Sequence, residues 1–360
     1  MTIGIPKELH DNRIAMVPDT MKKLPSEQVQ FLVEQEAGVT ASLPDTAFEG
    51  VAAIADRAKI FQSSDIIVSI NPLDSDELAT VKKGTLLISM FAPYVDDSIV
   101  GKLKNHGLQG VSMDMIPRTT LAQAMDILSS MASVAGYKAV LTAASHLPRY
   151  FPMMITAAGS IRPAKVLVLG AGVAGLQAIA TARRLGAMVE AFDVRKAAKE
   201  EVQSLGAKFV EVAGAADDTS AGGYAVEQSE EFIQRQRAEV QNRAAKADVI
   251  ITTAQVRGRK APILLPTETV DKMKPGSVVV DLASSTGGNC EVSKDNEIVI
   301  YNNVKIIGNS ALASDMPQDA STLFSNNILN FLKLIIKDGQ LVLDMENEII
   351  QSALITGEKD

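Results

Sequence analysis

Short runs of apolar, β-branched residues alternate along this chain with longer stretches of helical periodicity. The runs most typical of strands are residues 2–5, 65–70, 85–90, 165–169, 188–193, 208–212, 249–252, 277–281 and 305–307. Residues 166–169 (Val-Leu-Val-Leu) are apolar without interruption, which indicates a strand buried on both faces of a parallel sheet. The alternation predicts βαβ units, and therefore an α/β protein with doubly wound, Rossmann-like sheets.

The helical pattern suggests a division into domains. A long helix is expected from near Thr120 to about His146, ahead of Pro148. Thr120 and Gln123 have the spacing of a capping box, in which side chains at the helix start satisfy free backbone N–H groups. We interpret this helix as a bridge to a second domain that runs from about residue 130 to 310. A further helix is expected over residues 320–337.

Composition and charge narrow the class of protein. The length of 360 residues predicts about two domains, and 46% hydrophobic with 22% charged residues is typical of a globular chain. A net charge of −8 without a Lys/Arg-rich run argues against a nucleic-acid partner. One cysteine and three histidines favour a reducing compartment and give no reason to expect a metal site. No apolar run approaches the roughly 18–20 residues of a membrane span, so a cytoplasmic chain is expected.

A glycine motif follows the strand at residues 165–169. Gly170, Gly172 and Gly175 have the spacing G-x-G-x-x-G, with Ala171 and Val173 between them, and a helix begins there. In this motif the first glycine permits a tight turn, the second lets a pyrophosphate approach the backbone, and the third lets the helix pack on the strand. The free N–H groups of the helix N-terminus favour that anion. A glycine-rich turn that binds nothing is the alternative.

An acidic residue stands where a dinucleotide site needs one. Asp193 ends the next strand, 23 residues after Gly170, where its carboxylate accepts hydrogen bonds from a ribose and repels a 2′-phosphate. This favours NAD over NADP. We place Val194 and Arg195 in the same site. Arg195 leaves NADP open, because a guanidinium near the ribose accommodates a phosphate; the other alternative is that Arg195 is a solvated surface charge.

These motifs together resemble the alanine dehydrogenase/transhydrogenase family. The opening motif of the family is matched by residues 4–8, 12–15 and Pro18, and its second motif by residues 167–175, 185–187, Val189 and Asp193. Further matches are residues 118–130, 136–137, 222–225, 252–254, 281–283 and 287–291, so the resemblance covers nearly the whole chain. It is greater to the NAD(H)-binding component (alpha subunit, domain I) of proton-translocating NAD(P) transhydrogenase than to alanine dehydrogenase.

Two departures from alanine dehydrogenase support that choice. The dehydrogenase needs a Lys and a His near the substrate carbonyl, because amination and reduction of a keto acid involve proton transfer. The corresponding strand ends, residues 68–72 and 88–91, contain neither, and Arg13 alone cannot run the reaction. Hydride transfer between two nicotinamide rings needs contact, orientation and exclusion of water, and no general acid or base.

The reacting region implied by the resemblance contains Arg118, Gln123, Asp126 and Ser129. The last three are spaced by three residues, so we expect them to share a stripe on the first turns of the long helix. The resemblance places them beside the nicotinamide of NAD(H), with Gln123 bridging toward the second nicotinamide and Asp126 orienting the carboxamide or Arg118. The residues alone leave open that Gln123 is only a cap and that Asp126 is only a first-turn acid.

A polar, glycine-bearing segment at residues 213–227 has no periodicity, and long loops of this kind are often functional. The resemblance implies a mobile lid over NAD(H), with Gly223 beside the nucleotide and Tyr224 in the reacting region; a surface insertion is the alternative. Gln236, on the following helix, matches a nucleotide contact. Gln255 follows a strand end, where open α/β sheets bind ligands. Asp281 is expected to form a pocket wall or to be a satisfied structural acid.

The resemblance implies the remaining assignments. Residues 311–360 would return to the first domain, which gives a discontinuous domain of residues 1–128 with 311–360 and an NAD(H)-binding domain of residues 129–310, linked by long helices. The function expected is Si–Re (AB)-specific hydride transfer between NAD(H) here and NADP(H) on a partner component, coupled to proton translocation by a membrane-spanning component. A peripheral homodimer on the cytoplasmic face of the inner membrane is implied. The alternatives are a free-standing amino-acid dehydrogenase and a non-catalytic NAD(H)-binding protein.

Overall fold

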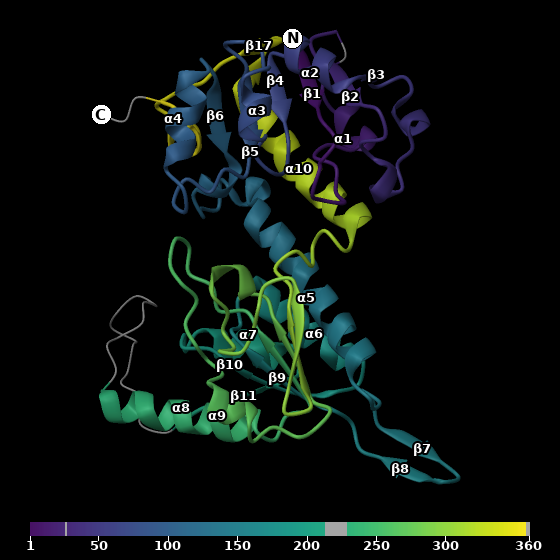
Figure 1. Ribbon diagram of the computed structural model, residues 1–360, viewed down its shortest axis with the longest axis vertical. Coiled ribbons are helices and arrows are strands. Elements are labelled where there is room, and N and C mark those ends of the chain that lie inside the picture. The colour runs from purple at the N-terminus through teal and green to yellow at the C-terminus, as the bar shows by residue number, and fades with distance from the viewer. Residues whose placement is uncertain (26, 213–228, 358–360) are drawn as a thin grey trace. The chain divides into compact units, whose positions relative to one another are not determined.

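The computed structural model describes residues 1–25, 27–212 and 229–357, and the chain divides into two compact units. Unit 1 comprises Met1–Met131 with Ala313–Asp360, and unit 2 comprises Ala132–Leu312. Each unit contains a largely parallel sheet with helices, so the predicted α/β class with two Rossmann-like domains is confirmed (Figure 1). The chain leaves unit 1 within helix α5 (Ile127–His146) and returns to it shortly before α10 (Pro317–Ile335).

The sheet of unit 1 has the strand order β3-β2-β1-β4-β5-β6, and every pairing in it is parallel. This is the doubly wound order, in which the chain moves outward first on one side of β1 and then on the other. The strands are β1 (Thr2–Ile5), β2 (Gln30–Glu34), β3 (Ala53–Ala55), β4 (Ile66–Val68), β5 (Leu86–Ser89) and β6 (Gln109–Ser112). Besides α10, the helices are α1 (Pro18–Met21), α2 (Arg57–Ser63), α3 (Ser75–Leu78), α4 (Ser98–Asn105) and α11 (Glu348–Ala353).

The sheet of unit 2 has the order β11-β10-β9-β12-β13-β15-β14, with only the edge strand β14 antiparallel. Its strands are β9 (Lys165–Leu169), β10 (Met188–Phe192), β11 (Lys208–Phe209), β12 (Val249–Thr252), β13 (Val278–Asp281), β14 (Glu297–Tyr301) and β15 (Val304–Gly308). Besides α5, the helices are α6 (Val173–Arg184), α7 (Ala198–Ser204), α8 (Glu230–Ala244) and α9 (Thr267–Val270). Two hairpins complete the fold: β7 (Met154–Thr156) with β8 (Gly159–Ile161), and, in unit 1, β16 (Ile336–Lys337) with β17 (Gln340–Leu341).

Strand β9 shows why uninterrupted apolar runs predict central strands. Val166 and Val168 belong to one buried cluster, and Leu167 and Leu169 belong to another. Successive side chains of a strand point to opposite faces, so both faces of β9 are covered. Burying both faces removes the need for polar positions and leaves a continuous apolar segment that begins and ends at the predicted residues.

The predicted start of the long helix near Thr120 is wrong, because α5 begins at Ile127. Gln123–Met125 form a separate 3₁₀ turn, and Asp126 has ψ 89°, which lies outside the helical range, so the turn does not continue into α5. The Asp126 carboxylate accepts hydrogen bonds from the Ser129 N–H at 2.9 Å and from the Ser129 hydroxyl at 2.6 Å, so it caps α5. The expected helical stripe of Gln123, Asp126 and Ser129 is therefore also wrong, since only Ser129 lies on the helix.

Helix α5 also corrects the expectation that no apolar segment is long enough to span a membrane. Within the described ranges it is the one helix that is long and apolar enough, by length and composition, to cross a membrane. In its 18-residue apolar window 39% of the residues are buried, among them Ala139, Val140 and Ala143. A Cβ at Gly136 would lie 2.1 Å from the Ala174 carbonyl oxygen, so α5 contacts α6 closely through small residues.

Candidate functional site

The turn between β9 and α6 is built around three glycines with different environments. Gly170 has φ +104°, a left-handed conformation that a side chain would strain. A Cβ at Gly175 would lie 1.9 Å from the Gly170 carbonyl oxygen, so this glycine is needed for α6 to pack on the turn. A Cβ at Gly172 would meet nothing within 4 Å. The backbone itself therefore requires Gly170 and Gly175, whereas Gly172 keeps open the space in front of α6.

That space adjoins the N-terminus of α6, which starts at Val173. Gly172 is its N-cap and provides no side chain to satisfy the first N–H groups of the helix. Unsatisfied N–H groups together with the positive end of the helix dipole make a site for a phosphate-sized anion. The residues predicted for a pyrophosphate thus stand where an anion has backbone donors and room.

Asp193 and Arg195 form one hydrogen-bonded unit with the glycine turn. One carboxylate oxygen of Asp193 accepts from the Ala171 N–H at 2.7 Å, and the other accepts from the Arg195 N–H at 2.8 Å. The Arg195 guanidinium donates to both oxygens at 3.1 Å and to the Ala171 carbonyl at 3.2 Å. Arg195 is thus ion-paired with Asp193 while 51% of its side chain stays exposed, so both alternatives given for it remain open.

The charge state of this pair follows from its contacts. Burial by itself would raise the pKa of Asp193, but the hydrogen bonds from Arg195 and Ala171 outweigh it and hold the pKa below its ordinary value. The same hydrogen bond to Asp193 raises the pKa of Arg195. Asp193 is therefore ionised at neutral pH, which is the state that accepts ribose hydroxyls. Val194, between them, exposes 71% of its surface.

The end of β12 joins the same edge of the sheet. β9 and β12 are neighbours but not consecutive in the chain, so the strand order switches direction between them. Ligands of open α/β sheets bind at the carboxyl ends of strands at this point. The Thr253 hydroxyl donates to the Gly170 carbonyl at 3.1 Å, and the Gln255 side chain donates to the Leu282 carbonyl at 3.0 Å. Gln255 thus lies at the predicted strand end, held toward β13.

Asn289 is a structural residue of the site to which the sequence assigned no role. Its side chain is fully buried, accepts from the Ala254 N–H at 2.9 Å and donates to the Ala254 and Pro262 carbonyls at 2.9 and 2.8 Å. It therefore fixes the segment that follows β12. The available signal was its place after Gly287 and Gly288, but an Asn beside glycines is equally typical of an ordinary turn.

Asp281 is a satisfied structural acid rather than a pocket wall. It is fully buried, and its carboxylate accepts from the Thr252 hydroxyl at 2.9 Å and from the backbone N–H groups of Ala283, Asn289 and Cys290 at 3.0, 2.9 and 3.0 Å. These four donors use its acceptor capacity. Burial raises the pKa of the neighbouring Cys290 thiol to about 12, so this cysteine is not a reactive thiolate at neutral pH.

Four of the predicted reacting residues, Arg118, Gln123, Asp126 and Ser129, belong to unit 1. Arg118 and Gln123 are exposed, and within the described part of the chain neither side chain has a hydrogen bond or ion pair. The turn that carries Gln123 is anchored to α10, because Asn327 donates to the Ala124 carbonyl at 2.8 Å. Asp126 and Ser129 are paired as the cap of α5.

Arg13, the residue shared with the dehydrogenase pattern, is committed to other contacts. It is 8% exposed, and its guanidinium donates to Asp11 at 2.9 and 2.6 Å and to the Met131 sulfur at 2.9 Å. At the end of β4, Asn71 donates to Glu8 at 3.1 Å. Burial raises the pKa of Glu8 despite this hydrogen bond. An internal ion pair therefore neutralises the guanidinium that a substrate carboxylate would need.

The remaining predicted residues are in unit 2. Gln236 is half-buried on α8, in the first half of that helix. Gly223 and Tyr224, with the rest of the segment 213–227 predicted as a lid, lie outside the described residues. The structure thus brings together Gly170, Ala171, Gly172, Val173, Gly175, Asp193, Val194 and Arg195 at one strand end, with Gln255 beside it.

Comparison with known families agrees with this arrangement. The family model "Alanine dehydrogenase/PNT, N-terminal domain" matches residues 4–135, and "Alanine dehydrogenase/PNT, C-terminal domain" matches residues 139–359. An NAD(P) transhydrogenase alpha subunit of Rhodospirillum rubrum is 43% identical over 369 residues, covering 99% of this chain and 96% of that protein. The NAD(P) transhydrogenase subunit alpha of Haemophilus influenzae is 43% identical over 361 residues, covering 99% of this chain and 70% of that protein.

Solved structures give the same result. A transhydrogenase from Sinorhizobium meliloti superposes with a TM-score of 0.91 at 39% identity, covering 98% of both chains. An L-alanine dehydrogenase superposes with a TM-score of 0.76 at 23% identity, covering 98% of this chain and 99% of that one. The second similarity shows a shared fold.

Proposed function

The chain belongs to the alanine dehydrogenase/PNT family, and we propose that it is the NAD(H)-binding subunit of a transhydrogenase. In this proposal it exchanges a hydride directly with NADP(H) held by a partner component. The observation that carries the choice within the family is the Arg13–Asp11 ion pair, at 2.6 Å with both side chains buried. Residues 68–72 and 88–91 also lack Lys and His, so these two strand ends offer neither of the side chains that the dehydrogenase reaction needs for proton transfer.

The residues at the end of β9 would hold the nucleotide. NAD(H), when bound, supplies or accepts the hydride. The open side of Gly172 and the N-terminus of α6 would bind the pyrophosphate, with Ala171 and Val173 in the same turn. The ionised Asp193 would accept the ribose hydroxyls in exchange for its bonds to the Arg195 guanidinium and would disfavour a 2′-phosphate, so NAD(H) is selected over NADP(H). Val194, Arg195, Gln236 and Gln255 complete the proposed binding set.

The reacting end of the nucleotide is assigned to unit 1 by family resemblance. Arg118 and Gln123 support the assignment because their polar groups are free for a ligand within the described residues. Asp126, already bonded to Ser129, would act by positioning rather than as an acid. Gly223 and Tyr224 remain proposed lid residues. Together these groups would orient the ring and exclude water, which is what direct hydride transfer requires.

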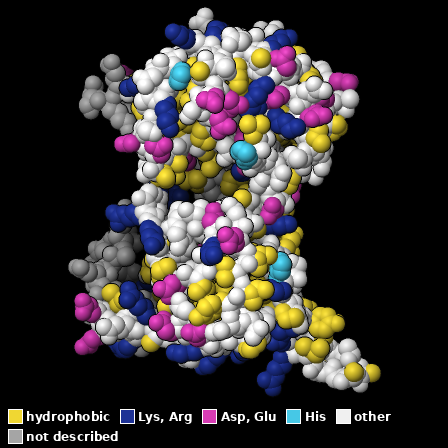
Figure 2. All heavy atoms as spheres, in the orientation of Figure 1, with side chains coloured by type: hydrophobic (Ala, Val, Ile, Leu, Met, Phe, Trp, Pro, Cys, Tyr) yellow, Lys and Arg dark blue, Asp and Glu magenta, His cyan; other side chains and the backbone are white. Residues whose placement is uncertain are grey.

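The relatives named as alpha subunits support partner subunits, and we extend this to an NADP(H)-binding component and a membrane-spanning, proton-translocating component. The chain would be peripheral on the cytoplasmic face of the inner membrane, and the transfer Si–Re (AB)-specific. A homodimer is also proposed. It is supported by the hairpin β7–β8, where Met153, Ile155 and Ile161 expose 59, 75 and 41% of their surface and hydrophobic side chains gather (Figure 2).

The test is reconstitution with the NADP(H)-binding component. NADH carrying deuterium on the A face of C4 should transfer the label to NADP⁺ without loss to water. Gln123→Asn should slow this transfer by about tenfold or more, since small misplacements of reacting groups are costly. Gln109→Asn, an exposed glutamine at the amino end of β6, is the matched control and should keep the parental rate.

Three outcomes would contradict the proposal. Transfer at the parental rate by Gln123→Asn would remove the site assignment. Oxidation of NADH with pyruvate and ammonia, without a partner, would establish the amino-acid dehydrogenase instead. Absence of transfer to any NADP(H)-loaded partner, with NADH still bound, would leave a non-catalytic binding protein.

A further inference from the structure

A cavity of about 220 Å³ in unit 2 lies away from the nucleotide end of the sheet. Lys165 and Met188, which line it, are the first residues of β9 and β10. The glycine turn and Asp193 follow the last residues of the same strands. Because β9 is five residues long, the two sites are separated by about 16 Å of strand. The cavity is therefore not part of the proposed nucleotide site.

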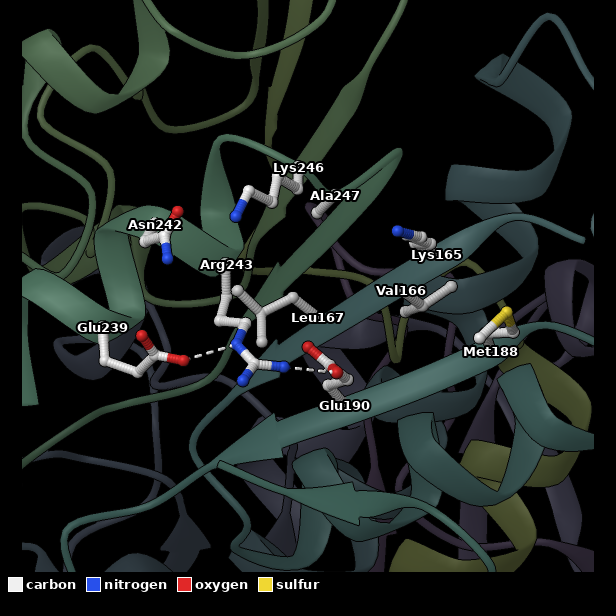
Figure 3. Close-up of a pocket in the computed structure, with 10 residues that line it drawn as sticks. All are labelled: Lys165, Val166, Leu167, Met188, Glu190, Glu239, Asn242, Arg243, Lys246 and Ala247. Atoms are coloured by element: carbon white, nitrogen blue, oxygen red, sulfur yellow. Dashed lines mark hydrogen bonds and ion pairs between the residues drawn. The ribbon is translucent and has the colours of Figure 1, made fainter. Parts of the chain in front are cut away.

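The cavity has an apolar floor and a helix along one side. Val166, Leu167 and Ala247 are buried side chains of the floor, and Met188, which is 53% exposed, borders the opening. The last two turns of α8 supply Glu239, Asn242 and Arg243 (Figure 3).

The carboxylates that line the cavity are already paired. The Arg243 guanidinium donates to Glu239 and to Glu190, each at 2.6 Å. The Lys208 ammonium lies 3.9 Å from Glu190. The hydrogen bond from Arg243 is the main cause that holds the pKa of Glu239 below its ordinary value. Both acidic groups are therefore compensated.

Two lysines of the cavity make no direct contact with a carboxylate of the described residues, although the charge of Lys246 helps to lower the pKa of Glu239. Within the described residues, the ammonium groups of Lys165 and Lys246 take part in no hydrogen bond or ion pair. In the view of Figure 3 both ammonium groups lie on one side of Leu167, and the Glu239–Arg243–Glu190 ion pairs lie on the other. The cavity thus combines an apolar floor with excess positive charge at one side, which suits a small anion with an apolar body.

We propose that this cavity is a second small-molecule site, specific for a compact apolar monocarboxylate. An apolar cavity of about 150 Å³ accepts benzene, so 220 Å³ accommodates a ring of that size with one carboxylate. The carboxylate would pair with Lys165 and Lys246, and the ring would pack on Val166 and Leu167. A dinucleotide is far too large for this volume.

The test titrates benzoate into the full chain by calorimetry, with benzamide as a neutral probe of the same shape. Benzoate should bind saturably with a Kd in the millimolar range or below, and benzamide at least about tenfold more weakly. The benzoate Kd should be unchanged with NADH at saturation, because the sites lie at opposite ends of β9 and β10. If NADH displaces benzoate, the anion occupies the pyrophosphate site and the proposal is overturned.

Variants locate the binding. Lys165→Met with Lys246→Met should weaken benzoate at least about tenfold, equal to about 1.4 kcal/mol, while NADH affinity stays parental. Lys272→Met, an exposed lysine of the same unit outside the cavity, is the matched control and should have no effect. Equal loss in both variants, no loss in either, or no saturable binding at about 10 mM benzoate would each overturn the proposal. None of these results bears on hydride transfer, so the proposed function is tested separately.

Discussion

Gly172 and Gly175 lie three residues apart in one turn, and the same substitution to Ala should affect them through different mechanisms. A Cβ at residue 175 would lie 1.9 Å from the Gly170 carbonyl oxygen and 2.8 Å from its carbon. A Cβ at residue 172 would meet nothing within 4 Å, and φ at this position is −76°, which Ala adopts freely. Gly175→Ala therefore perturbs the protein itself, and Gly172→Ala perturbs only what binds in front of α6.

The magnitudes follow from these distances. To bring the new methyl of Gly175→Ala to an ordinary contact of 3.4 Å, the start of α6 must move by about 1.5 Å from the 1.9 Å position. Overpacking of this kind costs about 1–3 kcal/mol, offset by up to about 1 kcal/mol of helix propensity. A net loss of about 2 kcal/mol lowers Tm by about 4–8 °C for a unit of this size. Gly172→Ala, at an N-cap, should cost only about 0.5 kcal/mol.

The assay is thermal unfolding of the full chain with and without NADH. Gly172→Ala should unfold within about 2 °C of the parent in the absence of NADH. With NADH at about 100 times the parental Kd, the parent gains about 2.7 kcal/mol, and a variant with tenfold weaker binding gains about half as much. Gly101→Ala, a helical glycine with nothing within 4 Å of its Cβ, is the control and should keep the full gain.

The opposite ranking would refute the reasoning. If Gly172→Ala unfolds several degrees below the parent without NADH, the space at residue 172 is not open. If it keeps the parental gain with NADH, no pyrophosphate passes close to Gly172, and the proposed binding mode fails.

Three further predictions concern buried or capping acids. Asp281→Asn should lower the free energy of unfolding in urea by about 4 kcal/mol, because the NH₂ group of the new asparagine must face two buried donors. Parental stability with loss of hydride transfer would instead make Asp281 catalytic. Asp126→Ala should cost about 1 kcal/mol through the lost α5 cap while Asp126→Ser keeps most of the stability, and equal Tm values for the two would contradict capping. For Asp248, burial raises the pKa, but the Lys165 N–H and the Lys274 ammonium hold it below its ordinary 3.8. The ionised carboxylate therefore contributes its full stabilisation above pH 3.8, and this contribution is lost as the pH falls below that value. In urea unfolding at several pH values, the difference in free energy of unfolding between the parent and Asp248→Asn should be constant above pH 3.8 and should decrease below it.

Local patterns predicted the central strands and the glycine turn. β9 and β12 begin and end at the predicted residues because both faces are buried, which leaves no polar position to confuse the pattern. Four strands of the two main sheets were not predicted: β2, β3, β6 and β14. Of these, β3 and β14 are edge strands with exposed positions, so their sequences lack a continuous buried apolar run.

The start of α5 shows where local patterns fail. Residues 120–123 and 126–129 both carry plausible helix-start signals, and a sequence window does not rank them. In the fold, Asn327 of α10 holds the Ala124 carbonyl across 203 residues of chain. This long-range hydrogen bond helps fix a 3₁₀ turn at Gln123–Met125, and the helix begins only after Asp126.

The α/β class and the G-x-G-x-x-G turn with its following acid could be predicted because they rest on residues close together in the chain, and the family could be predicted from motifs along its whole length. What those residues contact became visible only in the fold. It showed that Asp193 is paired with Arg195, that Arg13 is neutralised by Asp11, and that Asn289 is hydrogen-bonded to the segment after β12. It also placed the cavity at the opposite strand ends. These are questions of hydrogen-bond partner and charge compensation, which depend on where distant segments meet and not on the local pattern of residues.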